Sequence, residues 1–378
     1  MKKNVRSSNI ELLRIFAMAM IVVAHVVHNG VRFQLVDKTS IARMQNGFFC
    51  NPVFYKRLFL ISGVLPWGNI ANAVFILIAG YFMVERGRNI DLGKTSKKLL
   101  LQVGFAVLLR ILVPLVYYKI SSSAKTTLLN MGSINEFNSL WWFPGYYLLV
   151  VVVGRLFLNE QLNKIGRASY RNVLLVVFAV FSLCWPGGIL NSLADGFRTL
   201  ALGVFLYALG GYIKLYNPFA RIRSGALFLI ILVTYDLIYL SYYGIVQTGI
   251  HSYLAGNQAA DFIQPLYYVD NFSLVVVVLA VVLFELFSRI KLSSRIVNFF
   301  GGGTLMIYLI HGHGFWIQLV QGHDWVSLLF HNPLLYCFEV FKWAVFTYVA
   351  GVLGYFLFLS FMQLCTKFKY IVLKKVKV

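Results

Sequence analysis

Long apolar stretches recur along the whole sequence, and they restrict most strongly what this chain can fold into. Windows of about 20 residues, the length of helix that crosses a bilayer, pick out ten such stretches. They cover residues 9–29, 69–85, 99–118, 139–158, 172–190, 197–213, 224–243, 267–288, 296–320 and 334–362. Because 59% of the residues are apolar and only 12% are charged, an ordinary soluble domain is excluded. We therefore predict an all-α, polytopic transmembrane helical bundle of about ten spans.

The net charge of +21 is explained by how the basic residues are distributed between these spans. With the N-terminus inside, 23 of the 34 Lys and Arg residues fall in the six inner segments and seven fall in the outer ones. This asymmetry follows the positive-inside rule, so we predict that both termini are cytoplasmic. No basic domain is left over to bind nucleic acid. We expect a single transmembrane domain over residues 1–378, with no fused soluble domain.

The first span, residues 9–29, carries polar residues that are costly in hydrocarbon. Arg14 and His25 are eleven residues apart, which places them on one helix face about 16 Å apart. We predict that this face lines the bundle interior or a wet cavity, with Arg14 toward the inner leaflet and His25 toward the outer end. A simpler interpretation is an ion pair between Arg14 and Glu11, three residues earlier, together with two interfacial histidines, His25 and His28.

The ninth span contains three consecutive glycines, Gly301 to Gly303, followed by His311 and His313. The glycines either break the helix or permit close packing. They form no phosphate loop, because the Lys and Ser or Thr of that motif are missing. No acidic or histidine partner stands at helical ligand spacing, so we predict no metal site and expect His311 to line the same cavity as His25.

Charged residues also occur within other spans. Arg110 and Arg198 should face protein or water, where they could line the path of an anionic ligand. Alternatively, they pair with backbone carbonyls or with Asp236. Glu339 and Lys342, three residues apart, should form an ion pair with each other.

Aromatic residues gather near the predicted outer face. Trp141 and Trp142 precede a Pro-Gly pair at the outer end of the fourth span. Trp and Tyr normally belong to the interfacial belt of a membrane protein, which is the simpler interpretation. The alternative is an apolar platform for a sugar ring.

Several stretches together resemble a known family. Arg14 and His25 match its arginine–histidine signature, and four further blocks are similar in sequence and order: NAVFILIAGYFM (72–83), LWWFPGYYLL (140–149), VFLYALGGYI (204–213) and TLMIYLIH (304–311). The family is the integral-membrane acyltransferase-3 family, whose O-acyltransferases decorate bacterial surface polysaccharides. The chain departs from it at Ala79, where the family often has Ser, so no hydroxyl role is assigned there.

The resemblance implies an enzyme of the bacterial cytoplasmic membrane that transfers an acyl group to a hydroxyl of a surface glycan or its lipid-linked precursor. Acetyl-CoA or another acyl-CoA would be the co-substrate, with no permanently bound cofactor. His25 and Arg14 would be catalytic. The donor-binding candidates are Arg14, Arg110, Arg86 and Arg88, and the acceptor-side candidates are His311, Trp141, Trp142, Arg198 and Tyr81. The resemblance does not decide whether the protein forms a homo-oligomer.

Two other functions compete with acyl transfer. The intramembrane arginines would also suit a transporter or flippase for an anionic solute or glycolipid, although the sequence shows no pair of similar halves. The third alternative is a non-catalytic sensor or scaffold, which would tolerate the loss of Arg14 and His25 together.

Overall fold

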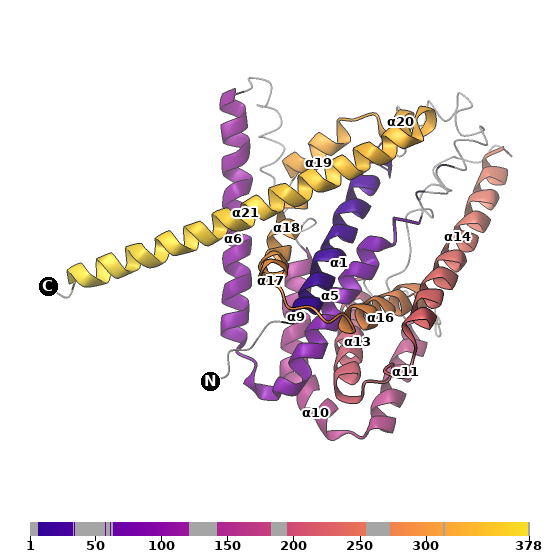
Figure 1. Ribbon diagram of the computed structural model, residues 1–378, viewed down its shortest axis with the longest axis horizontal. Coiled ribbons are helices and arrows are strands. Elements are labelled where there is room, and N and C mark those ends of the chain that lie inside the picture. The colour runs from indigo at the N-terminus through magenta and orange to yellow at the C-terminus, as the bar shows by residue number, and fades with distance from the viewer. Residues whose placement is uncertain are drawn as a thin grey trace.

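A computed structural model describes residues 7–32, 34, 57, 61, 63–120, 142–182, 195–254, 273–312 and 314–376 (Figure 1). Its α-helices are α1 (Ser8–Val27), α5 (Trp67–Met83), α6 (Leu92–Ile120), α9 (Trp142–Val153), α10 (Asn159–Lys164), α11 (Arg167–Ser182), α13 (Asp195–Tyr216), α14 (Ser224–Leu254), α16 (Leu274–Ser288), α17 (Arg295–Gly302), α18 (Thr304–His311), α19 (Gly314–Gln321), α20 (Trp325–His331) and α21 (Pro333–Val376). Two π-helical segments, η1 (His28–Arg32) and η5 (Gly154–Leu158), and one 3-10 helix, η3 (Val84–Asn89), extend them. No strand occurs in these ranges, which confirms the all-α prediction for the described residues.

Within the described residues, six helical stretches are long and apolar enough to cross a membrane. They are Ser8–Val31, Trp67–Gly87, Trp142–Lys164, Phe197–Tyr216, Ser224–Ser241 and Pro333–Phe368. Helix α16 is also apolar, but with 15 residues it is shorter than these six stretches. The chain is therefore a multi-pass helical membrane protein. The ten spans and the cytoplasmic termini stay predictions.

Helix α1 lies in the middle of the bundle (Figure 1). It packs against α5, α16, α17, α18 and α21. Its side chains Leu13, Met18 and Ile21 are completely buried, which accounts for its position between so many neighbours. The residues of the first span are thus surrounded by protein on most sides, as a membrane helix with a cation inside it requires.

Helices α5 and α13 cross with their backbones in direct contact. A Cβ atom on Gly80 would lie 1.9 Å from the backbone oxygen of Tyr207, and one on Gly210 would lie 2.1 Å from that of Leu77. Only glycine permits such an approach of two backbones, and small residues serve this purpose widely in membrane proteins. The pair of glycines therefore fixes how the second and sixth predicted spans meet.

The predicted ninth span is not one helix but three, α17, α18 and α19. The chain turns at Gly303 and again at Gly312. A Cβ atom on Gly303 would lie 2.9 Å from the Tyr355 ring, so the glycine stretch both interrupts the helix and permits close packing. By contrast, the last predicted span, 334–362, forms part of a single 44-residue helix, α21, whose C-terminal part projects away from the other helices (Figure 1).

Candidate functional site

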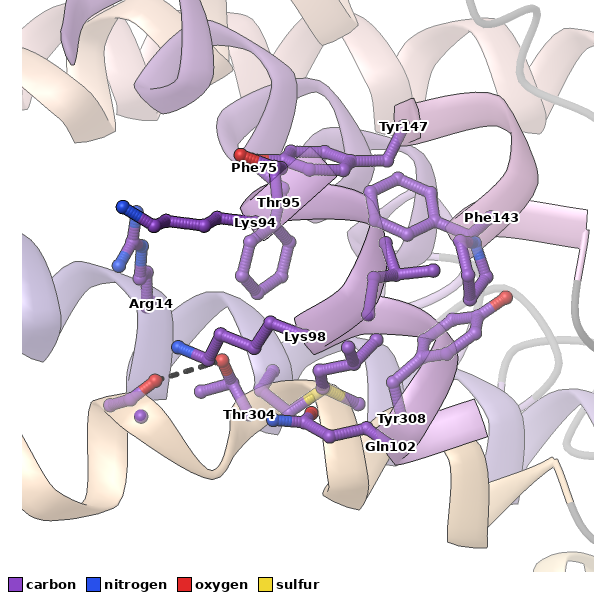
Figure 2. A pocket seen from close by; sticks show the side chains of 16 residues that line it. Arg14, Phe75, Lys94, Thr95, Lys98, Gln102, Phe143, Tyr147, Thr304 and Tyr308 are labelled. Atoms are coloured by element: carbon purple, nitrogen blue, oxygen red, sulfur yellow. Dashed lines mark hydrogen bonds between the residues drawn. The ribbon is translucent and has the colours of Figure 1, made fainter. Parts of the chain in front are cut away.

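A cavity of about 420 Å³ opens beside Arg14, between α1, α5, α6, α9, α17 and α18. Figure 2 shows the nitrogen ends of Arg14, Lys94 and Lys98 on one side of this cavity. The rings of Phe143 and Tyr308 lie on the opposite side. The cavity therefore has a cationic end and an aromatic end, an arrangement suited to an amphipathic anionic ligand.

The Arg14 side chain is held in place by Glu11. Arg14 Nη1 donates a hydrogen bond to Glu11 Oε1 at 2.9 Å, which confirms the ion pair expected from their spacing. The carboxylate is buried, whereas 30% of the Arg14 side chain remains exposed. Glu11 in turn lies against Gly301, where a Cβ atom would come within 2.2 Å of Glu11 Oε2. The glycine of α17 thus makes room for the carboxylate that orients Arg14.

Four polar residues of α6 line the cavity, and three of them, all except Thr95, follow one another at intervals of four. These three are Lys94, Lys98 and Gln102, and this spacing repeats one helix face. Asp91 caps the start of α6, because its Oδ1 accepts a hydrogen bond from the Lys94 backbone N–H at 2.9 Å. That hydrogen bond lowers the pKa of Asp91 below its usual value. The side chain of Gln102 is buried, and its Oε1 atom has no hydrogen-bond partner among the described residues, so it is available to accept a hydrogen bond from a ligand.

His25 and His311 form a pair in contact, with ring centroids 4.8 Å apart and the rings nearly edge to face. His25 Nδ1 lies 2.8 Å from the carbonyl oxygen of Ile21, and His311 Nδ1 lies 2.5 Å from that of Tyr308. A carbonyl can only accept, so each neutral imidazole donates from Nδ1 and keeps its lone pair on Nε2. In the part of the chain that the structure describes, no three His, Cys, Asp or Glu side chains come together as metal ligands.

A second, much smaller cavity touches both imidazoles. Its volume is about 10 Å³, which is room for one water molecule or one hydroxyl group. Besides the two histidines it is bordered by Asn29, Trp316 and Thr347. The Trp316 indole N–H donates to Thr347 Oγ1 at 2.5 Å, which fixes that wall. The imidazoles of His25 and His311, each a potential general base, thus border a space that can hold one hydroxyl group.

Tyr308 lies between the two cavities. Its ring lines the cavity beside Arg14 and also contacts the His311 ring, at a centroid distance of 5.0 Å. On its other side it packs against Phe143, at 5.5 Å. Arg14 and His25 are eleven residues apart on one continuous helix, so about 16 Å separates them along its axis. Tyr308 therefore connects the wall of the Arg14 cavity to the histidine pair.

The other predicted donor-binding residues do not line this cavity where they are described. Arg86 lies exposed on η3, outside the cavity wall. The side chains of Arg88 and Arg110 lie outside the described part of the chain. Lys94 takes a position at the cationic end that sequence reasoning did not single out.

Of the predicted acceptor-side residues that the structure describes, only His311 lies beside His25, and the others are spread over the molecule. Trp142 begins α9, is 42% exposed and contacts the Tyr146 ring in a tilted arrangement, with ring centroids 5.4 Å apart. Arg198 lies in the first turn of α13, and neither cavity includes it. Tyr81 lies near the end of α5 and has the Lys214 ammonium 5.1 Å from its ring centroid. Trp141 and His313 fall outside the described residues.

Sequence reasoning missed Gln102, Tyr308 and Trp316 as wall residues. Of these, only Gln102 carried a signal that could have been used, namely its four-residue spacing from Lys98 on an otherwise apolar helix. Tyr308 and Trp316 are single aromatic residues in apolar stretches. Their roles depend on how α18, α19 and α21 pack.

A family model described as an acyltransferase domain matches residues 7–367, nearly the whole chain. No curated protein and no solved structure matches significantly. The match covers every element of both cavities and favours acyl transfer over transport of a solute. The chain therefore belongs to the acyltransferase-3 family and is a membrane-bound acyltransferase.

Proposed function

We propose that this enzyme transfers an acetyl group from acetyl-CoA to a hydroxyl of a bacterial cell-surface polysaccharide or of its lipid-linked precursor. The reaction takes place in the bacterial cytoplasmic membrane. The donor enters from the cytoplasm, and the acceptor approaches the opposite end of the first span. Acetyl-CoA is a co-substrate, and no cofactor is permanently bound.

The cationic end of the larger cavity supports an acyl-CoA donor. Arg14, Lys94 and Lys98 offer positive charge and hydrogen-bond donors to phosphate oxygens. The positive-inside rule predicts that this end faces the cytoplasm, where acyl-CoA is made, and this supports the proposal. The nucleotide of CoA carries the phosphates, while the thioester sits at the far end of a long, flexible arm. The phosphates would bind near Arg14 while the arm extends past Tyr308 toward His25.

The histidine pair supports the chemistry. In one mechanism, His25 Nε2 takes the proton of the acceptor hydroxyl as the oxygen attacks the thioester carbonyl. A C–O bond forms, the C–S bond breaks, and the CoA thiolate leaves and is protonated. In the other mechanism, Nε2 attacks the thioester itself, and the acyl-histidine then passes the acyl group to the hydroxyl. Both mechanisms need a free lone pair on Nε2. The Nδ1 hydrogen bond to the Ile21 carbonyl supports this, because it keeps the ring proton on Nδ1.

One observation carries the proposal: a continuous, central helix places Arg14 in the wall of a cationic cavity and His25 beside a hydroxyl-sized space. Mass spectrometry of surface polysaccharides from cells with and without the gene tests it. The gene should add a mass of one acetyl group to a glycan. A His25→Ala protein, inserted at the normal level, should lose that mass, and retention of wild-type acetylation would remove His25 from the mechanism.

The two mechanisms can be separated by withholding the acceptor. Purified protein incubated with acetyl-CoA labelled in the acetyl group would retain label on His25 only if an acyl-histidine forms. A general base leaves the protein unlabelled until the glycan is added. A His311→Gln variant serves as the matched control, since this residue shares the cavity with His25.

A further inference from the structure

An apolar groove of about 510 Å³ lies on the far side of α13 from the site described above, between α11, α13, α14 and α16. In Figure 1, α16 crosses the region where α11, α13 and α14 meet. The groove is open at the surface, because the wall residues Leu175 and Leu274 are more than half exposed. Its wall is apolar apart from two residues, Arg171 and Glu285. In a membrane, such an opening between helices faces lipid.

The charged residues at one end of the groove leave a net positive rim. Glu285 is neutralised by Arg289, whose Nη2 lies 2.8 Å from Glu285 Oε1. Arg171 donates to the amide oxygen of Asn172 at 3.4 Å, contacts no carboxylate in the described ranges, and lies exposed. Two further exposed arginines, Arg221 and Arg223, flank the wall residue Ile222. This rim therefore attracts an anion.

The dimensions of the groove match one leaflet of a bilayer. Its wall follows α16 from Leu274 to Glu285, a separation of eleven residue steps or about 16 Å. Half of a hydrocarbon core of about 30 Å is about 15 Å. The basic rim belongs to segments that the positive-inside rule assigns to the cytoplasmic side, and the cytoplasmic leaflet is the one that carries anionic lipids.

We propose that this groove binds one acyl chain of an anionic phospholipid from the surrounding bilayer, with the lipid phosphate held by Arg171, Arg221 and Arg223. The apolar wall takes the chain, and the guanidinium groups take the headgroup. Basic recesses between membrane helices on the cytoplasmic side bind anionic headgroups by the same combination of forces. The site is independent of the proposed acetyl transfer.

Native mass spectrometry of the full-length protein in detergent micelles tests the proposal. Phosphatidylglycerol and phosphatidylethanolamine with identical acyl chains serve as probes. Wild-type protein should bind phosphatidylglycerol at least tenfold more tightly. The double variant Arg171→Gln/Arg223→Gln should weaken phosphatidylglycerol binding by roughly fivefold for each charge removed. Its binding of phosphatidylethanolamine, whose ammonium group offsets the phosphate charge, should fall by a smaller factor, and the binding that remains also shows that the variant is folded.

Two further variants complete the test. Arg295→Gln/Lys367→Gln removes two exposed basic residues that do not line the groove, and it should bind both lipids as the wild type does. Val278→Trp fills the groove and should abolish binding at this site for both lipids. The proposal is overturned if the wild type binds the two lipids equally, if the two double variants behave alike, or if Val278→Trp leaves binding unchanged.

Discussion

Replacing Gly301 by alanine tests how the glycine stretch supports Arg14. The new Cβ atom would lie 2.2 Å from Glu11 Oε2 and 2.7 Å from Glu11 Cβ. Both distances are too short for atoms in contact, so either the Glu11 side chain moves or α1 and α17 separate. Overpacking of this kind costs about 1–3 kcal/mol. Alanine is the better helix former by about 1 kcal/mol, which offsets part of that cost.

Gly104→Ala is the matched control. Gly104 lies within α6, and a Cβ atom there would have nothing within 4 Å. Both variants gain the same helix propensity. The difference between their free energies of unfolding therefore gives the cost of overpacking alone, about 1–3 kcal/mol. We expect Gly301→Ala to show the lower apparent melting temperature of the two, measured in the same detergent at one scan rate.

The same substitution should also affect the donor site. Arg14 is oriented by Glu11, so displacement of the carboxylate should raise the KM for acetyl-CoA in Gly301→Ala but not in Gly104→Ala. If Gly301→Ala matched Gly104→Ala in both melting temperature and KM, the assignment of Gly301 as the residue that makes room for Glu11 would be wrong.

Three further substitutions test other contacts. Lys98→Gln should raise the KM for acetyl-CoA roughly two- to fivefold with little change in kcat, as expected for one exposed charge; an unchanged KM would remove Lys98 from the donor site. Gly210→Ala should destabilise the fold by about 3 kcal/mol, because the new Cβ atom would collide with the Leu77 backbone. The yield of folded protein in membranes should therefore fall, and a normal yield would contradict this. Tyr207→Phe removes the hydrogen bond of 3.0 Å to buried Asn159 Oδ1, so thermal unfolding should show a loss of about 1–3 kcal/mol, and wild-type stability would refute that role.

Short-range features of the fold followed directly from the sequence. The ion pair between Arg14 and Glu11 and the one between Lys342 and Glu339, where Nζ lies 2.6 Å from Oε1, are both three residues apart on a helix. Such pairs depend only on helix geometry, which is the same in any bundle. The break of the ninth span at Gly303 was likewise foreseeable, because consecutive glycines weaken a helix wherever they occur, but the second break, at Gly312, was not predicted.

Long-range features did not follow from the sequence. Most of these helices are apolar all round, since lipid and protein neighbours are equally hydrophobic, and periodicity then cannot say which face is buried. Lys94 on α6 and Tyr308 on α18 reach the Arg14 cavity only because the three helices pack together. Conversely, Arg86 looked like a donor ligand from its charge alone but lies outside the cavity wall.

The central claim is a division of labour along α1, with the donor held near Arg14 and the acyl group transferred at His25. Binding of acetyl-CoA and single-turnover acetyl transfer, measured on purified His25→Gln and Arg14→Gln proteins, test it most directly. We predict that His25→Gln binds acetyl-CoA as tightly as the wild type but transfers the acetyl group about 10²- to 10⁴-fold more slowly. Arg14→Gln should lose donor binding. Wild-type transfer by His25→Gln, or wild-type donor binding by Arg14→Gln, would contradict the claim.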